Sequence, residues 1–118
     1  MIRSIDEAIS RLEYILELKN RIAYDHFETA QELPFACYTY DFHTDGADDY
    51  KGVQWIDFAL ELYSEQRDFA LEHKILIAFD DTPVTSSSKY IKSERMYMTV
   101  FKARFPYKLT TVYPKKGQ

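Results

Sequence analysis

The most constraining feature of the chain is an uninterrupted stretch, Gly52 to Phe79, in which one pattern of apolar residues gives way to another. From Val53 to Tyr63 the residues alternate between two faces. The apolar face carries Ile56, Phe58, Leu60 and Leu62. The other face is mixed and carries Trp55, Asp57, Ala59, Glu61 and Tyr63. A period of two is typical of a β-strand with one buried face.

After Ser64 the apolar spacing becomes helical. The residues that keep this spacing are Phe69, Glu72, Ile75, Leu76 and Phe79. No Gly or Pro separates the strand pattern from the helix pattern, and Asp80 to Pro83 stops the helix because proline cannot continue it. Glu65 and Asp68 are placed in the first turn of this helix. The stretch therefore predicts a strand that leads directly into a helix, which folds back over the apolar face of the strand.

Another helix is predicted near the N-terminus, from about Ile5 to Lys19. Ser4 and Glu7 have the spacing of a capping box. The apolar stripe consists of Ile5, Ala8, Ile9, Leu12, Ile15 and Leu16. Two ion pairs are expected on the outer side, Glu7–Arg11 and Glu17–Arg21. The polar face is mainly acidic, which disfavours a membrane-surface helix, so we expect a sheet or another protomer to cover the stripe.

Further strands are predicted on both sides of the central one. They are a short strand at Ile22–Phe27, a strand at Phe35–His43, a long extended stretch at Tyr90–Phe105 that ends at Pro106, and a short edge strand at Leu109–Tyr113. A bulge near Ser93 or Glu94 is expected to split the long stretch into two strands. The connections are expected to be loops at Thr29–Pro34, Thr44–Gly52 and Thr85–Ser88.

These elements predict a single α+β domain over residues 1–118. The order α-β-β-β-α-β-β indicates an antiparallel or mixed sheet of about four to five strands with two flanking helices. Hydrophobic residues make up 46% and charged residues 29%, which is ordinary for a globular domain. One cysteine, Cys37, allows no internal disulfide, and the sequence shows neither a signal peptide nor a run of about 20 apolar residues. We therefore expect a protein that is made in the cytoplasm and does not enter a membrane.

The net charge of −4 is unevenly distributed. Residues 1–101 hold 10 Lys or Arg and all 19 Asp or Glu, a net charge of −9. Residues 102–118 hold five Lys or Arg and no acidic residue, a net charge of +5. Either residues 106–118 form a flexible, solvated basic tail, or this segment docks on an acidic surface such as that of a neighbouring copy. The acidic body argues against nucleic-acid binding as the main role.

The sequence predicts no metal site. Asp45, Asp48 and Asp49 lack the spacing of an EF-hand loop and favour a solvated hairpin loop instead. The three histidines, His26, His43 and His73, lie on separate elements without a metal-binding motif.

No catalytic or cofactor-binding residue is predicted either. Cys37 has no activating neighbour along the chain and is expected to be a small buried hydrophobe, while Ser86 to Ser88 form no nucleophile elbow. Asp57 and Glu61 share a strand face about 13 Å apart, which is wide for a catalytic pair, so a solvated face is expected. Five aromatic residues have the ring character of a stacking platform for single-stranded nucleic acid, but acidic neighbours favour a core or a subunit interface. They are Tyr38, Tyr40, Trp55, Tyr97 and Phe101.

Three segments resemble those of the small tail-completion proteins of long-tailed bacteriophages and prophages. LPFACYTYDF resembles their Pro-led second strand, and DFALELYSEQRDFALEHKILIAF resembles their strand-into-helix unit. YIKSERMYMTVFKARF resembles their late hairpin before the last core strand. The order and spacing of the segments match, and the resemblance extends from Ile5 to Phe105.

This resemblance implies a tail terminator or head–tail joining protein. Such proteins have an α+β fold and form a ring, commonly a hexamer, that caps the tail tube and docks it to the head connector. The implied partners are further copies of the chain, the tail-tube protein and the connector, with DNA passing through the lumen without specific binding. The implied locations are the host bacterial cytoplasm during assembly and the head–tail junction of the virion. The family brings no catalytic residues, so no enzymatic activity is expected.

Two other functions remain open at this stage. One is a small intracellular adaptor or ligand-binding domain that dimerises through a sheet edge or a helix. The other is an enzyme with a carboxylate site that no motif reveals. Ring-shaped particles favour the phage interpretation, whereas a compact dimer with a deep apolar pocket favours the adaptor.

Overall fold

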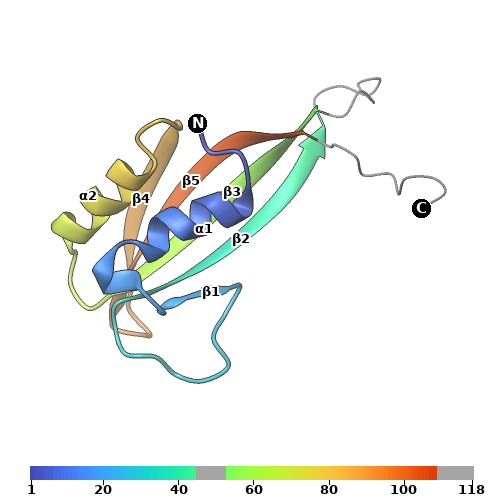
Figure 1. Cartoon of the computed structure of the whole chain (residues 1–118). Helices are drawn as coiled ribbons and strands as arrows, with labels where there is room; N and C mark the ends of the chain where they lie inside the picture. Colours follow the sequence, from blue (N-terminus) through green and yellow to red (C-terminus); the bar gives the residue numbers. More distant parts are fainter. Residues whose placement is uncertain (45–52, 109–118) are drawn as a thin grey trace.

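The computed structural model describes residues 1–44 and 53–108. Helix α1 (Ile5–Glu13) and a 3₁₀ turn η1 (Leu16–Leu18) precede three strands, β1 (Ile22–Tyr24), β2 (Phe35–Thr44) and β3 (Val53–Ser64). Helix α2 (Phe69–Ala78) and the strands β4 (Val84–Ile91) and β5 (Met96–Lys108) follow (Figure 1). The predicted α+β class and the order α-β-β-β-α-β-β are confirmed.

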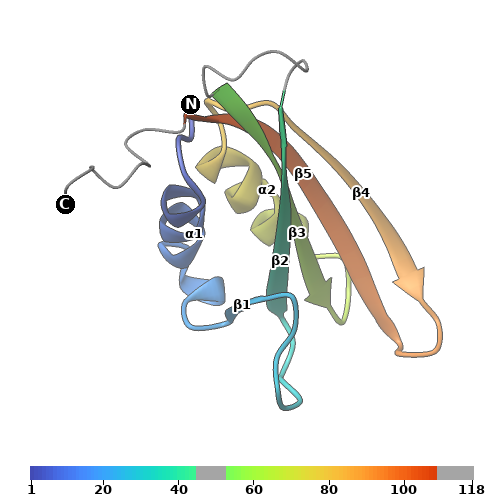
Figure 2. The same ribbon diagram turned by 90° about the vertical axis from the view of Figure 1, so that its right-hand side faces the viewer.

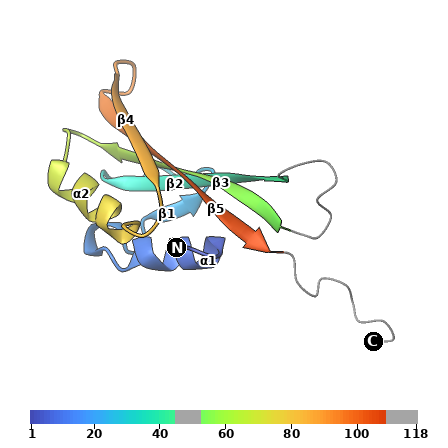
Figure 3. The same cartoon turned by 90° about the horizontal axis from the view of Figure 1, so that it is seen from above.

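The strands form one mixed sheet in the order β1-β2-β3-β5-β4. Strand β1 runs parallel to β2, and all other neighbours are antiparallel. Strand β3 pairs with β2 over ten residues and with β5 over twelve, so the central strand of the sequence pattern is also the centre of the sheet. Both helices lie on the same side of this sheet (Figures 2 and 3).

The hydrophobic core fills the space between the helices and the sheet. The apolar face of β3 is almost completely buried, and Phe58 contacts the rings of Phe79 from the end of α2 and Phe105 from β5. Helix α1 contributes Ala8 and Leu12, which are both fully buried. The other fully or nearly fully buried apolar residues of the sheet and of α2 are Ile56, Leu60, Leu62, Leu71, Ile75 and Phe101.

Helix α1 is shorter than predicted. Ser4 caps it as expected, since its hydroxyl accepts a hydrogen bond from the Glu7 backbone N–H, but the helix ends at Glu13 and Ile15 is extended. The chain turns here so that Ile15 and Leu18, three residues apart, both enter the core through η1. Leu16 consequently points to solvent and is 81% exposed, although the helical stripe had predicted it to be buried.

The early end of α1 also changes one ion pair. The predicted pair of Glu7 with Arg11 is present at 2.8 Å. The predicted pair of Glu17 with Arg21 is wrong, because these residues are not on one helix. Glu17 instead pairs with Lys74 of α2 at 2.9 Å, which links the two helices.

Helix α2 begins later than the change of apolar spacing after Ser64 predicted. Strand β3 continues through Ser64, and Asp68 caps the helix by accepting a hydrogen bond from the Leu71 N–H at 3.0 Å. Asp68 therefore precedes the first turn rather than lying in it. Phe69 and Leu76, assigned to the buried stripe by the sequence, are 66% and 38% exposed, whereas Leu71 takes a buried position.

The segment from Thr85 to Ser88 was predicted as a loop but lies within β4. Its serines keep the extended backbone because β5 supplies hydrogen-bond partners along the whole strand, so sheet pairing overrides the local preference for a turn. The predicted interruption near Ser93 and Glu94 is present, as a hairpin turn between Ile91 and Met96 rather than a bulge.

Strand β5 does not end at Pro106 as predicted but continues to Lys108. Pro106 is paired with β3 on one side. On its other side no strand of the described chain pairs with it, because the pairing of β4 with β5 starts at Val84 opposite Ala103. Proline is tolerated in strands mainly at positions that lack a neighbour on one side, and β4 does not reach Pro106. The predicted acidic loop around Asp48, the predicted strand at Leu109–Tyr113 and most of the predicted basic tail lie outside the described residues.

Candidate assembly surfaces

No helix or strand of the described chain covers the face of the sheet opposite the helices, and only the segment of residues 25–31 borders one end of it, near Cys37 and Met96 (Figure 3). We call this face of the sheet the bare face. Its central row is the mixed face of β3 that the sequence singled out, Trp55, Asp57, Ala59, Glu61 and Tyr63. These residues are all half-buried, since their neighbours on β2 and β5 shield them laterally. The row is thus too polar for a core and too aromatic for ordinary surface.

Asp57 is the centre of a charged cluster on the bare face. Its carboxylate accepts hydrogen bonds from Arg104 of β5, the shorter at 2.6 Å, and its other oxygen lies 3.1 Å from Nδ1 of His43 on β2. The hydrogen bond from Arg104 and, after it, the one from His43 lower the pKa of the Asp57 carboxyl. These side chains come from three neighbouring strands, so the cluster ties the strands together and keeps Asp57 ionised.

Glu61 and Cys37 occupy the other end of this face. The Tyr63 hydroxyl donates a hydrogen bond of 2.7 Å to Glu61, and burial together with this carboxylate raises the pKa of Tyr63. Cys37 is buried as predicted, and burial followed by the charge of Glu61 raises the pKa of its thiol. A raised thiol pKa means that little nucleophilic thiolate forms near neutral pH.

The bare face has two halves of different charge. The half formed by β4 and β5 presents basic residues and apolar residues. Its members are Thr85, Ser87, Lys89, Ile91, Met96, Met98, Val100, Lys102 and Arg104. None of these is acidic, and Lys89 and Lys102 are exposed. On the β2–β3 half, Asp57 and Glu61 already have partners, and Asp41 is exposed.

The helical face carries an open groove of about 840 Å³ between α1 and α2. Apolar side chains line it and are unusually exposed: Tyr14 at 93%, Leu16 at 81% and Ile77 at 55%. Asp80 and the Lys74–Glu17 pair lie at its rim. Contiguous exposed apolar residues with a polar rim are typical of sites where another molecule binds.

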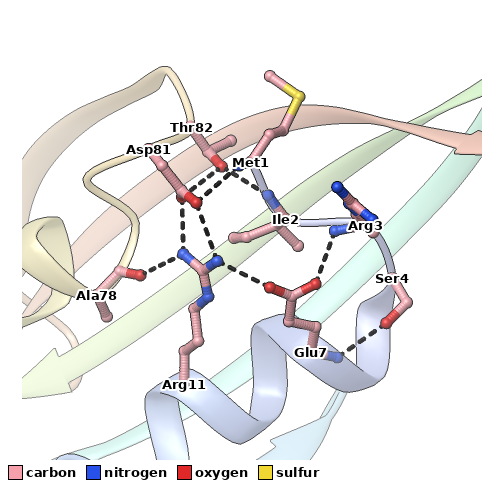
Figure 4. Close-up of polar contacts among 9 residues, drawn as sticks. All are labelled: Met1, Ile2, Arg3, Ser4, Glu7, Arg11, Ala78, Asp81 and Thr82. Carbon is pink, nitrogen blue, oxygen red and sulfur yellow. Dashed lines mark hydrogen bonds and ion pairs between the residues drawn. The ribbon is translucent and has the colours of Figure 1, made fainter.

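A network of hydrogen bonds closes one end of this groove (Figure 4). Arg11 donates to both oxygens of Asp81, to Glu7 and to the carbonyl oxygen of Ala78. The Met1 ammonium also donates to Asp81, at 2.7 Å. The hydrogen bond from Arg11, followed by that from the Met1 ammonium, lowers the pKa of Asp81, so the carboxylate stays ionised and fixes α1 to the end of α2.

A second polar cluster lies beneath the start of α2. Glu72 is only 8% exposed, and Arg67 binds it with two hydrogen bonds of 2.9 Å. The Thr99 hydroxyl donates to Glu72 at 3.4 Å and lies 2.6 Å from the hydroxyl of Ser88. The sequence placed Glu72 on the helix stripe, and the structure explains how the core tolerates it.

The histidines that the sequence considered are not brought together. His26 lies next to Asp25 and Glu28 before β2, where Asp25 and then Glu28 raise its pKa. His43 belongs to the Asp57 cluster, and His73 is exposed on α2. Within residues 1–44 and 53–108, no three His, Cys, Asp or Glu side chains are grouped so that they could hold a metal ion.

The aromatic residues considered as a stacking platform are divided between the two faces of the sheet. Phe101 is in the core, and Tyr38 contacts Phe58 on the helical side. Tyr40 and Tyr97 face the same side, whereas Trp55 lies on the bare face. The core interpretation is confirmed for Phe101, and Tyr38 and Tyr40 pack against the core, whereas the alternative of a subunit interface stays a prediction.

The fold defines a class, an α+β sandwich with two helices on one face of a mixed five-stranded sheet. No family model and no curated protein matches the chain. Among solved structures, a chain described as "Virion of native gene transfer agent (GTA) particle" is similar, with a TM-score of 0.52 and 13% sequence identity. The match covers 84% of this chain and 91% of that chain. At this identity the similarity is one of fold, and it extends over most of both chains. In the described part of the chain, no helix has the length and apolar character needed to span a membrane.

Proposed function

We propose that the protein is a structural component of a phage-like virion. The observation that carries this proposal is the similarity of fold to a chain of a gene transfer agent particle, which covers 84% of this chain and 91% of the other. A match of this extent concerns the whole fold of both chains rather than one shared motif. The uncovered, mixed surfaces on both sides of the fold support a role in assembly.

Within such a particle we propose the more specific role of a tail terminator or head–tail joining protein. The sequence segments that resemble this family correspond to β2, to β3 with α2, and to the β4–β5 hairpin, which together make up most of the sheet. A ring on the tail tube would bring copies of the chain, the tail-tube protein and the head connector together in the host cytoplasm. The ring is a mechanical component and has no enzymatic role in this proposal.

Two charged segments have assigned roles in the proposed ring. The acidic loop with Asp45, Asp48 and Asp49 is proposed to face the lumen, where negative charge repels passing DNA. Replacing the three residues by Asn is expected to reduce infectivity or gene transfer, and unchanged infectivity argues against this placement.

The basic segment after Lys108 is proposed to dock on a neighbouring copy. Since Pro106 to Lys108 belong to β5, truncation directly after Lys108 leaves the described fold intact. Light scattering of the truncated chain is expected to show weaker association than that of the full chain. Equal association of the truncated chain and the full chain would contradict this docking role.

The proposed function is tested by deleting the gene in a strain that produces particles and imaging the lysate by electron microscopy. We expect heads and tails that are not joined, or tails of irregular length, and expect that expression of the chain restores normal particles. A matched strain expressing the Leu12→Asp variant, which places a charge at a fully buried position, serves as a control for a chain that does not fold. Normal particles in the deletion strain would contradict the proposed function.

A further inference from the structure

We propose that copies of this chain associate head to tail, with the groove between α1 and α2 of one protomer packed on the β4–β5 half of the bare face of the next. This inference rests on the proposed function for its biological setting, since it names how the copies in a ring contact one another. The contact itself is inferred from the apolar residues, the charges and the positions of the two surfaces.

Apolar residues contribute to both surfaces, exposed in the groove and half-buried on the β4–β5 half. The groove presents Tyr14, Leu16 and Ile77, which are all more than half exposed. The β4–β5 half presents Met96, Met98 and Val100 in the strand next to the centre of the sheet. Burial of such side chains against each other contributes about 25 cal/mol for each Å² of apolar surface removed from water.

The charges of the two surfaces are complementary. The lining of the groove holds three acidic residues, Glu7, Asp80 and Asp81, and two basic residues, Arg11 and Lys74. Asp80 is exposed, and no ion pair of Asp80 is present in the described part of the chain. The β4–β5 half presents the exposed Lys89 and Lys102 and no acidic residue. Complementary potentials favour this pairing and orient it.

The same charges disfavour symmetric contacts. Two grooves placed together would offer Asp80 no unpaired cation of the lining, because Arg11 already pairs with Asp81 and Lys74 with Glu17. Two bare faces placed together would offer the lysines Asp41 as their one exposed acidic partner on the described strands, because Arg104 already neutralises Asp57, and Glu61 accepts from Tyr63. The helical face therefore offers the better partner for the β4–β5 half.

The two surfaces lie on opposite sides of the molecule (Figure 3). A contact between unlike surfaces leaves one unoccupied surface of each kind at the ends of a dimer, so further copies can add. Such a contact produces a ring if the rotation between copies closes, and a filament if it does not. A head-to-tail contact is thus the kind that a ring requires.

The test uses two variants, each with one damaged surface. Leu16→Lys/Ile77→Lys places positive charge in the groove, and Lys89→Glu/Lys102→Glu places negative charge on the β4–β5 half. All four positions are exposed, so the fold is expected to persist, which far-UV circular dichroism and thermal unfolding confirm or refute. The control Lys92→Glu/Arg95→Glu reverses two exposed charges in the β4–β5 turn.

Sedimentation velocity over a range of concentrations measures association. We expect the full-length chain and the control to associate, and expect each damaged variant to associate at least tenfold more weakly. In an equimolar mixture, the intact sheet surface of the groove variant is expected to pair with the intact groove of the sheet variant. The mixture is therefore expected to form heterodimers at concentrations where neither variant associates alone.

Three results overturn the inference. The first is a full-length chain that stays monomeric up to about 1 mM, a concentration at which even a weak contact of about −4 kcal/mol would be seen. The second is a groove variant that associates like the full-length chain. The third is a mixture of the two damaged variants without heterodimer. A symmetric contact of bare faces would give the second result, because the groove variant keeps its bare face intact. This assay uses the isolated chain and no virus-like particle. Its result therefore tests the contact between copies separately from the proposed role in the virion.

Discussion

Three leucines at the end of the first helical segment allow a quantitative test of the fold. Leu12 and Leu18 are completely buried, whereas Leu16 between them is 81% exposed. A continuous helix to Lys19 would instead bury Leu16 with the rest of its apolar stripe. Single substitutions to Ala therefore distinguish a helix that ends at Glu13 from a helix that continues to Lys19. Each substitution removes the same atoms, so only the burial of the leucine differs.

The expected cost follows from burial. Replacing a fully buried Leu by Ala removes apolar contacts and leaves a cavity, which costs about 2–5 kcal/mol of unfolding free energy. We expect this loss for Leu12→Ala and Leu18→Ala, and a change within about 0.5 kcal/mol for Leu16→Ala, as for other surface positions. With a urea dependence of roughly 1.5 kcal/mol/M, a loss of 3 kcal/mol lowers the unfolding midpoint by roughly 2 M.

Urea unfolding followed by circular dichroism measures these differences. It is done at low micromolar protein concentration, where association through the groove does not contribute. A loss of 2 kcal/mol or more for Leu16→Ala under these conditions would refute the end of α1 at Glu13. A loss for Leu16→Ala that appears only at high concentration would instead indicate burial of this residue between copies.

Three further predictions concern the turn, the buried ion pair and the outer cluster. Arg95 has a φ of 55°, so Arg95→Gly is expected to raise the unfolding free energy by about 1 kcal/mol in the same assay, and a loss of stability would contradict this. Glu72 is buried and Arg67 is at the surface. Arg67→Leu leaves the buried carboxylate without its charged partner, so it is expected to lower the urea midpoint more than Glu72→Leu. Equal losses of stability for the two variants would contradict the burial of Glu72. Because its pKa is lowered, ionised Asp57 stabilises the fold above the ordinary carboxyl pKa of about 3.9, and this stabilisation is lost as the pH falls through the lowered value. An NMR titration is expected to show the Asp57 pKa rising toward its ordinary value in Arg104→Gln, and an unchanged pKa would exclude Arg104 as the main cause.

The sequence predicted the class, the order of elements and the central position of β3 because these depend on hydrophobic periodicity. It did not predict where α1 ends, because the stripe of apolar residues continues past Glu13 although the chain must turn toward β1. Nor did it identify β4, whose run of serines is polar and resembles a loop. Pairing with β5 determines that strand, and pairing between distant segments is not a local signal.

The candidate surfaces were predictable in part. Alternation along β3 already separated the mixed row of Trp55 to Tyr63 from the core row, and that row lies on the bare face as expected for a surface available to another protomer. The groove between the helices was not predicted, since it forms only when η1 leaves Leu16 in solvent next to Ile77 of α2. The Asp57 cluster also depends on the register of three strands, which places His43 and Arg104 on either side of it.

The place that we propose for the chain is the junction between head and tail of a phage-like particle. Immunogold electron microscopy of purified particles, with an antibody against the folded chain, tests it most directly. We predict label at the position where the tail meets the head, and none on particles from a strain that lacks the gene. Label confined to the capsid surface or the distal tail would contradict the junction role, and particles without any label would contradict the structural role itself.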